Sequence, residues 1–377
     1  MPETLVYWTY EQTPHLASLI NQLASGGWRC VWATEIGLTE ERKKLGFHAP
    51  ELINVESVHA NNAKHVELMA KNSPESTLHI IHSFRGTKMN RIAFRTAIAS
   101  GAHVAIVTEN RNQPGWRSIP RSLAYRSDSR MVSRGVKWVF VNGYSGHRGG
   151  REFYTGLGWP EALLFPFGYF WSASDRVAIR PGDGPYRIAY VGQLIHRKGV
   201  DVLLRALSLI RGLDWQLELI GDGPDLPSLQ KMSTELGLEG RVHFAGVSPL
   251  SDIPARIAGA DVLVVPSRFD GWGMVVNEGL AAGLPVVCSD TCGAQDLLGD
   301  SFLGQTFRSE DALDLSEILG VRISSVRETQ SEREARLKWY NEHATARVAA
   351  QYMIDAFANV FEDRPRPTPP WIGGKAI

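Results

Sequence analysis

The sequence has little cysteine, no net charge and no long apolar run. Three cysteines occur, Cys30, Cys288 and Cys292, and so small and odd a number favours a reducing compartment over a disulfide framework. Cys288 and Cys292 form a CxxxC pair, but no second pair of cysteines or histidines stands at zinc-binding spacing. We therefore expect buried thiols and no metal site.

Positive and negative side chains balance, because Lys plus Arg and Asp plus Glu number 40 each. A balanced total gives no support for a nucleic-acid partner. No stretch approaches the roughly 18 apolar residues of a membrane span, and the segment MPETLVYWTYEQTPHL has no basic region followed by a long apolar one. The expected protein is cytoplasmic, with neither signal peptide nor membrane span.

The chain is longer than one core usually supports. At 377 residues, two domains of about 150 to 200 residues are expected. Apolar strand-like segments alternate with helical ones in both halves, which is typical of α/β folds with parallel sheets. The predicted strands are Leu5–Tyr10, Arg29–Thr34, Leu78–His82, His103–Thr108, Trp138–Asn142, Arg187–Val191, Gln216–Ile220, Val242–Ala245, Val262–Val265 and Pro285–Cys288.

The predicted domain boundary lies after residue 172. The segment LLFPFGYFWSAS, Leu163 to Ser174, has no helical periodicity, and RPGDGPY, residues 180–186, is typical of a connector. We expect one Rossmann-like domain over residues 1–172 and a second over 180–340. A helix over 341–362 and a proline-rich tail over 363–377 would follow.

Two acids stand out in the run PSRFDGWGMVVNEGLAAGLPVV, Pro266 to Val287. Gly271 and Gly273 allow backbone to approach a ligand closely, and the helix predicted from about Met274 offers its N-terminal N–H groups to an anion. Asp270 precedes that helix, and Glu278 lies about one turn inside it. Such acids can accept hydrogen bonds from hydroxyl groups at the two ends of a ligand with an anionic middle. A nucleotide sugar has that shape. The alternative is that Asp270 only caps the helix and Glu278 is solvated.

A second candidate segment is YVGQLIHRKGVD, Tyr190 to Asp201, a strand followed by a loop and a helix. Arg197 and Lys198 in this loop can neutralise a diphosphate, although two surface cations are the simpler interpretation. Further on, LIGDGP, Leu219 to Pro224, lacks the third glycine of GxGxxG, so an NAD site is not supported.

These segments together resemble a known family. The order VGQLIHRKGVD, LIGDGP, VHFAGV and ADVLVVPSRFDGWGMVVNEGLAAGLPVVCSD is similar to the C-terminal half of the family 4 glycosyltransferases, which are retaining nucleotide-sugar enzymes of the GT-B fold. That fold has two Rossmann-like, doubly wound α/β domains facing across a cleft.

The resemblance implies a donor site for a UDP- or GDP-sugar. Asp270 would bind hydroxyls of the transferred sugar and Glu278 the ribose, while Lys198 and Arg197 would hold the diphosphate. Backbone groups complete the implied set: Gly192, Gln193, Gly271, Gly273, Met274 and Val275, with Val247 at the base. Gln193 stands where the family commonly has arginine, and Asp270 where it usually has glutamate.

The N-terminal half is expected to bind the acceptor. His82 ends one predicted strand and Glu109 directly follows another, and Glu109 occupies the place where many relatives have a histidine near the reacting sugar. The implied catalytic set is therefore Asp270, Lys198, Arg197 and Glu109. The alternatives are a structural His82 and a Glu109 tethered by Arg111 or Arg117.

The segment Arg111 to Arg151 contains nine Lys or Arg residues and one acid, Asp128, with Trp116, Tyr125, Trp138 and Tyr144 interleaved. Such a face can attract anionic membrane or a lipid diphosphate. A solvated basic surface is the alternative.

The resemblance therefore implies a metal-independent, retaining hexosyltransferase without cofactor. Its acceptor would be a hydroxyl of a saccharide or lipid-linked molecule, in cell-surface polysaccharide biosynthesis. A silent nucleotide-sugar-binding protein, or an epimerase or phosphorylase of the same fold, is the competing hypothesis.

Overall fold

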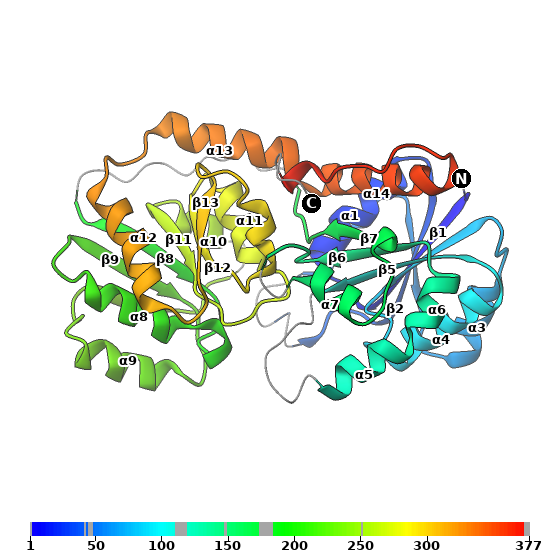
Figure 1. Cartoon of the computed structure of the whole chain (residues 1–377), viewed down its shortest axis with the longest axis horizontal. Coiled ribbons are helices and arrows are strands. Elements are labelled where there is room, and N and C mark those ends of the chain that lie inside the picture. The colour runs from blue at the N-terminus through cyan, green and yellow to red at the C-terminus, as the bar shows by residue number, and fades with distance from the viewer. Residues whose placement is uncertain are drawn as a thin grey trace. The chain divides into compact units, whose positions relative to one another are not determined.

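The computed structural model divides the chain into two compact units and describes residues 2–40, 43, 48–109, 119–146, 149–172, 184–249 and 252–372. Unit 1 comprises residues 1–172 and 345–370, and unit 2 comprises residues 173–344 and 371–377. Each unit is built on one parallel sheet with helices packed around it (Figure 1).

The sheet of unit 1 has seven strands in the order β3-β2-β1-β4-β5-β6-β7, all paired in parallel. Parallel sheets are covered on both faces, so their strands are nearly continuous apolar runs, as in the fully buried sequence WVFVN of β6. The strands are β1 Thr4–Glu11, β2 Arg29–Ile36, β3 Val55–His59, β4 Thr77–His82, β5 His103–Glu109, β6 Trp138–Asn142 and β7 Leu164–Phe167.

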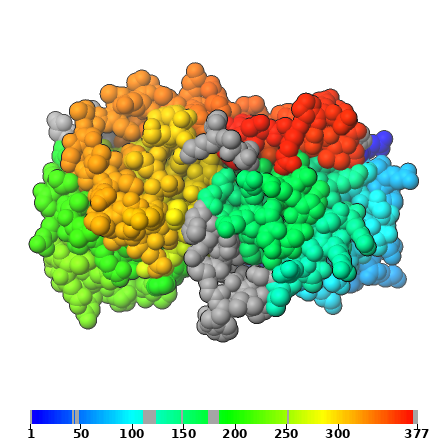
Figure 2. Space-filling view, viewed as in Figure 1, coloured from blue at the N-terminus to red at the C-terminus, as the bar shows by residue number. Residues whose placement is uncertain are grey.

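The helices of unit 1 include α14, which comes from the far end of the chain. Trp138 Nε1 in β6 donates a hydrogen bond to Ala356 O of α14 at 2.7 Å, and the Trp138 ring lies 5.0 Å from that of Phe357. In the space-filling view, α14 (red) lies against the surface of its own unit (Figure 2). The helices are α1 Pro14–Ser25, α3 Ala63–Lys71, α4 Lys88–Ala99, α5 Ile119–Ser127, α6 Ser129–Gly135, α7 Gly150–Gly156 and α14 Ala346–Phe361, with the short turn η2 Glu161–Leu163.

The sheet of unit 2 has six parallel strands in the order β10-β9-β8-β11-β12-β13. Its strands are β8 Tyr186–Val191, β9 Trp215–Ile220, β10 Val242–Gly246, β11 Val262–Val265, β12 Val286–Ser289 and β13 Gly304–Phe307. Its helices are α8 Val200–Leu209, α9 Leu226–Glu235, α10 Ile253–Ile257, α11 Met274–Ala281, α12 Ala312–Ser324 and α13 Gln330–His343, with the short turns η3 His196–Lys198, η5 Gly293–Leu297 and η6 Pro370–Ile372.

The structure contains edge strands that the sequence did not predict. One is β7, Leu164–Phe167, which lies in the segment without helical periodicity and pairs with β6 at the edge of the sheet. Pro166 argued against a strand in the sequence, because proline lacks the N–H that donates to a neighbouring strand. It is tolerated in an edge strand, where one side is unpaired. The last helical region is divided in two, since α13 ends at His343 and α14 begins at Ala346.

Both sheets follow the doubly wound order 3-2-1-4-5-6, which reverses direction beside the first strand of each unit. Ligands of such sheets bind beyond the carboxyl ends of the strands at this switch point. The switch lies between β1 and β4 in unit 1 and between β8 and β11 in unit 2. Those two strand ends are therefore the places to search for a site.

Candidate functional site

An ion pair joins the two strand ends at the switch point of unit 2. Lys198, in the turn after β8, donates a hydrogen bond from Nζ to Asp270 Oδ2, in the loop after β11. Both side chains are largely buried, with 18% and 14% of their surface exposed, and Arg197 Nη1 lies 3.8 Å from the same carboxylate oxygen. The structure thus brings together three of the residues predicted for the donor site.

Gly199 allows the turn that carries these cations. Its φ of +68° lies in the left-handed region, and a Cβ at this position would stand 2.0 Å from Pro266 O. The close approach is held by a hydrogen bond from Arg268 N to Arg197 O at 2.8 Å. A residue with a side chain would push the two loops apart, so the spacing of Lys198 from Asp270 depends on this glycine.

The DGWG turn is fastened to the segment after β12. Cys292 Sγ donates to Trp272 O at 3.1 Å, and Gly293 N donates to Asp270 O at 3.0 Å. Gly273 has a φ of +98° and begins α11 at Met274, where helix formation was predicted. The first N–H groups of α11 therefore follow directly after Asp270, as an anion site requires.

Glu278 lies in α11, on the helix whose N-terminus follows Asp270. Burial of its carboxyl group raises its pKa to about 7, while the positive charge of Lys198 acts in the opposite direction. Loss of water around a carboxylate disfavours the charged form, which is the cause of the rise. Glu278 is therefore only partly ionised near neutral pH and would gain from a hydroxyl partner.

The remaining donor-site residues of the sequence analysis lie at or just after strand ends in unit 2. Gly192 follows β8 and its N–H donates to Ile220 O at 3.0 Å, and Gln193 is exposed. Val247 follows β10 and is 57% exposed. Gly271, Met274 and Val275 are half-buried beside Asp270 and at the start of α11.

Sequence reasoning missed Arg268. Its guanidinium group donates two hydrogen bonds to the carboxylate of Asp201, at 2.7 and 2.8 Å, and one to His196 O at 2.7 Å. It thereby ties the loop after β11 to the turn after β8 and to the start of α8. The sequence shows only an arginine close to Asp270, and nothing in it indicates that the partner is Asp201, 67 residues away.

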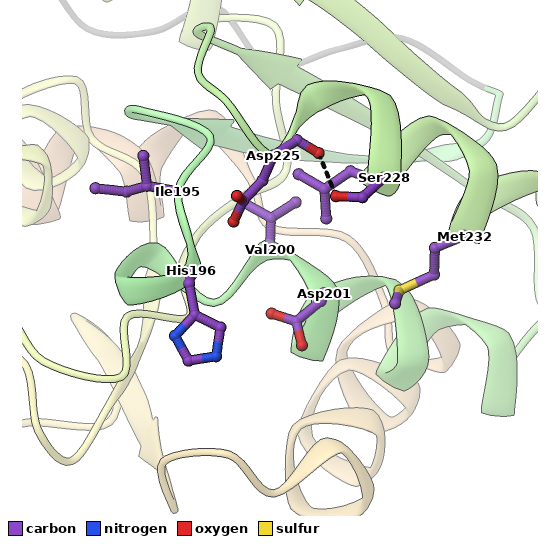
Figure 3. Close-up of a pocket in the computed structure, with 8 residues that line it drawn as sticks. Ile195, His196, Val200, Asp201, Asp225, Ser228 and Met232 are labelled. Carbon is purple, nitrogen blue, oxygen red and sulfur yellow. Dashed lines mark hydrogen bonds between the residues drawn. The ribbon is translucent and has the colours of Figure 1, made fainter.

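A cavity of about 220 Å³ lies beside the same turn (Figure 3). Ser228 at its wall donates to Asp225 O at 2.7 Å. Lys198, Asp270 and Glu278 do not line the cavity, so it is separate from the ion-paired cluster. Its lining residues are Ile195, His196, Val200, Asp201, Asp225, Ser228, Leu229 and Met232.

At the switch point of unit 1, His82 and Glu109 are joined through a residue that sequence reasoning missed. Tyr169, two residues after β7, donates from Oη to Glu109 Oε1 at 2.9 Å, and His82 Nε2 lies 2.8 Å from the same hydroxyl. Arg111 and Arg117, considered as tethers for Glu109, lie outside the described residues.

The basic segment is partly described, since residues 110–118 and 147–148 lie outside the description. Tyr125, Trp138 and Tyr144 are buried, so these three aromatic rings belong to the core of unit 1 and not to its surface. Asp128 pairs with Arg85. Within the part of the chain that is described, no helix is both long and apolar enough to cross a membrane.

Comparison of the sequence with known proteins finds a family match within unit 2. Residues 173–335 match the family model "Glycosyl transferases group 1". A GDP-mannose-dependent alpha-(1-6)-phosphatidylinositol monomannoside mannosyltransferase of Mycolicibacterium smegmatis is 29% identical over 264 residues, 64% of this chain and 66% of that protein. The lipopolysaccharide core biosynthesis glycosyltransferase LpsE of Rhizobium meliloti is 36% identical over 129 residues, 34% of this chain and 36% of that one. The matches thus span between about a third and two thirds of these relatives.

Solved structures resemble the whole fold. A glycosyltransferase from Rickettsia africae gives a TM-score of 0.72 at 13% identity, covering 97% of this chain and 100% of that chain. Anabaena HepE in complex with UDP gives 0.70 at 15% identity, covering 94% of this chain and 100% of that chain. Such low identities establish the fold alone, and the fold is GT-B, as predicted.

Proposed function

We propose that this chain, whose residues 173–335 match the family model of the group 1 glycosyl transferases, is a retaining glycosyltransferase using a UDP- or GDP-sugar. The observation that carries the proposal is the Lys198–Asp270 pair at the switch point of unit 2, followed directly by the N-terminus of α11. A cation, an acid and a helix N-terminus in that order suit diphosphate with a sugar attached.

The cations act on the leaving group. When the bond between the anomeric carbon and the phosphate oxygen breaks, negative charge grows on the nucleoside diphosphate. Lys198, Arg197 and the N–H groups of Met274 and Val275 stabilise that charge, and fixed charges of this kind supply the largest share of many rate enhancements. The acceptor oxygen bonds to the anomeric carbon on the same face, its hydroxyl proton passes to the departing phosphate oxygen, and the cations at this site make a metal ion unnecessary.

The acids orient the donor. Asp270 accepts hydrogen bonds from hydroxyls of the transferred sugar, and Glu278, four residues into α11, accepts from the ribose. Arg197 supports diphosphate binding where the family's usual arginine is replaced by Gln193, because its guanidinium lies beside Asp270 and donates to Phe269 O at 2.9 Å. The site then holds two cations in spite of Gln193.

The acceptor is a hydroxyl group of a saccharide or a lipid-linked molecule, and unit 1 binds it. The relatives named above act in lipopolysaccharide core biosynthesis and on a phosphatidylinositol monomannoside, which supports a role in building cell-surface polysaccharide or glycolipid on the cytoplasmic side. His82 and Glu109 at the switch point of unit 1 are the candidate acceptor contacts.

A donor screen tests the proposal. UDP-glucose, UDP-galactose, UDP-N-acetylglucosamine and GDP-mannose are each titrated by calorimetry and then incubated with acceptors while release of nucleoside diphosphate is followed. We expect one donor to bind and to be consumed only when acceptor is present. Donor binding without acceptor-dependent release of nucleoside diphosphate would favour the silent binding protein. Gln193 in place of arginine and Asp270 in place of the longer glutamate are the features that support that alternative.

The ribose contact has its own test. Glu278→Ala should weaken donor binding about tenfold, because a hydrogen bond to a charged group contributes roughly 1.5 kcal/mol or more. Glu235→Ala, at an exposed position on α9, is the matched control. Unchanged donor affinity in Glu278→Ala would show that the assignment of the ribose contact is wrong.

Peripheral contact with anionic membrane is the remaining part of the proposal. Arg126, Arg130 and Arg134 are exposed on α5 and α6, and basic surface of this kind is attracted to anionic lipid. Flotation with phosphatidylglycerol vesicles at low salt should carry the protein upward, and the triple change of these arginines to serine should reduce it. Absence of flotation would remove membrane contact from the proposed function.

A further inference from the structure

Three segments of unit 2 enclose the cavity beside the turn that carries Lys198. His196 comes from the turn η3, Asp201 from α8, and Ser228 and Met232 from α9 (Figure 3). The cavity has a volume of about 220 Å³. Since a cavity of about 150 Å³ can hold benzene, this one has room for a molecule of roughly ten non-hydrogen atoms.

Hydrogen bonds hold the walls of this cavity in place. At the start of α9, Asp225 N donates to Leu194 O, in the loop after β8, at 3.0 Å. At η3 and α8, the Arg268 guanidinium group donates to the carboxylate of Asp201 and to His196 O. A preformed cavity of this kind can bind a small molecule without the cost of ordering a loop around it.

The deeper lining of the cavity is apolar. Val200 and Leu229 are buried, and Met232, a side chain that adapts its shape and contacts aromatic rings favourably, is half-buried. The polar lining residues His196 and Ser228 are exposed. Such a cavity takes up the apolar part of a molecule and leaves its polar end close to solvent.

The two carboxylates at the cavity differ in how their charges are balanced. Asp201 accepts two hydrogen bonds from Arg268 and lies 3.0 Å from Arg205 Nη2. The half-buried carboxylate of Asp225 makes no hydrogen bond or ion pair with any residue that the structure describes, and it does not cap α9, which it directly precedes. Within that part of the chain its negative charge is unbalanced, and a bound cation would supply the partner.

The polar groups beside Asp225 suit an ammonium group. Ser228 Oγ donates to Asp225 O at 2.7 Å and keeps its lone pairs to accept a hydrogen bond. The imidazole ring of His196 makes no hydrogen bond or ion pair with the described residues. An ammonium group carries several N–H donors, which a carboxylate, a hydroxyl oxygen and an imidazole nitrogen can accept.

A metal ion does not match this lining. No group of three or more His, Cys, Asp or Glu side chains that could hold a metal ion is found within the described ranges of the chain. The apolar side chains of the cavity would also lie against a hydrated ion without gain. The lining matches instead a cation that carries its own apolar body.

We propose that this cavity binds a small organic ammonium ion, with the ammonium group at Asp225 and an apolar body against Val200, Leu229 and Met232. None of the acids and cations assigned to the donor lines the cavity. The cavity is therefore a second ligand site in unit 2, which goes beyond the proposed function.

The first test uses three probes that share an aromatic body and differ in charge. The cation 2-phenylethylammonium, the alcohol 2-phenylethanol and the anion phenylacetate are titrated by calorimetry into the whole chain at neutral pH. We expect the cation to bind with a Kd on the order of 0.1 to 1 mM, as a ligand of about nine non-hydrogen atoms allows. The alcohol should bind about tenfold more weakly, because it lacks the charge, and phenylacetate should not bind.

Two results of this titration would contradict the proposal. Equal affinity for the cation and the alcohol would show that Asp225 does not recognise charge. Absence of saturable binding of the cation up to about 10 mM would show that the cavity is not a site for this class of ligand.

A charge-removing variant places the cation at Asp225. Asp225→Asn keeps the shape of the side chain and should weaken binding of 2-phenylethylammonium about tenfold, while the affinity for 2-phenylethanol stays the same. Asp214→Asn, the same change at an exposed position just before β9, should alter neither affinity. If Asp225→Asn binds the cation as tightly as the wild type does, the assignment to this carboxylate is wrong.

A blocking variant tests the cavity itself. Ser228 and Ser331 are exposed serines in the first turns of α9 and α13. Ser228→Phe should abolish binding of the cation by filling the cavity, whereas Ser331→Phe should preserve it. Melting curves of both variants show whether they are folded, and if Ser228→Phe is not, Asp225→Asn decides alone. Undiminished binding by a folded Ser228→Phe would overturn the site.

A competition experiment distinguishes this inference from the proposed function. The cation is titrated again in the presence of a saturating amount of the donor that the screen identifies. We expect both ligands to bind together, and displacement of the cation by donor would show that the cavity belongs to the donor site. If no donor binds, the proposed function fails, while the three probes and Asp225→Asn still decide the ammonium site.

Discussion

At the carboxyl edge of the unit 2 sheet, Lys198 and Asp270 form a largely buried ion pair, whereas at the same edge of unit 1 a chain of hydrogen bonds runs from His82 through Tyr169 to Glu109. The sheet orders are alike, so the backbone does not cause this difference. Fixed cations suit a phosphate-bearing ligand, and a carboxylate held by an uncharged hydroxyl suits hydroxyl groups. One architecture thus presents two kinds of chemistry through the side chains at its switch points.

The comparison is tested most strongly by removing the cation. Lys198→Met should reduce acceptor-dependent release of nucleoside diphosphate about 1,000-fold, the upper range for losing one stabilising group at developing charge. Lys231→Met, an exposed site on α9 with 77% of the side chain accessible, should leave the rate unchanged. A loss of less than tenfold in Lys198→Met would mean that unit 2 does not act through this fixed charge, and the contrast with unit 1 would not hold.

The geometry that brings the ion pair together depends on Gly199, and no such requirement exists at Gly212. Gly199→Ala should destabilise the protein by about 3 kcal/mol, because the backbone is left-handed and the new Cβ would meet Pro266 O. Gly212→Ala, with nothing within 4 Å of its Cβ, should change urea unfolding by less than about 0.5 kcal/mol. Equal stability of the two variants would contradict the close loop approach.

Glu278 makes the unit 2 site sensitive to pH. Its folded-state pKa of about 7 is raised above the ordinary 4.5, so the neutral form is favoured by folding. The contribution of Glu278 to the free energy of unfolding is therefore fully present below pH 4.5. It is lost as pH rises through 7, by up to about 3 kcal/mol. Glu278→Gln should flatten this loss in melting curves from pH 5 to pH 8, and Glu235→Gln should not. If the wild-type protein loses no more stability between pH 5 and pH 8 than Glu278→Gln does, burial of this carboxyl group costs little.

The smallest expected effect concerns the support of the cations. Arg268→Leu removes the hydrogen bonds to Asp201 and His196 O, so the turn that carries Lys198 loses a tether. Because the cation is then positioned less firmly, donor KM should rise about tenfold, which corresponds to about 1.4 kcal/mol. Acceptor KM should stay constant. Arg256→Leu, which breaks the half-buried pair with Glu218 at 2.7 Å, is the control. Equal changes in both KM values would point to general loosening.

The elements predicted from sequence are those whose signal is local. β6 at Trp138–Asn142 and β11 at Val262–Val265 were predicted to the residue, because a compact apolar run needs no distant partner to be recognised. The edge strands β3 and β13 were missed. Their burial patterns are mixed, since an edge strand packs on one side only and carries a weaker apolar signal.

The candidate sites divide in the same way. Asp270, Glu278 and Lys198 could be named from the sequence because each lies in a short segment with a characteristic glycine turn and helix start. Tyr169 and Arg268 could not, since their partners lie 60 and 67 residues away. The sequence alone determined the alternation of strands and helices and the two loops that carry charge. Only the tertiary structure decided which side chains meet, because the order of strands in a parallel sheet brings together residues that no local pattern connects.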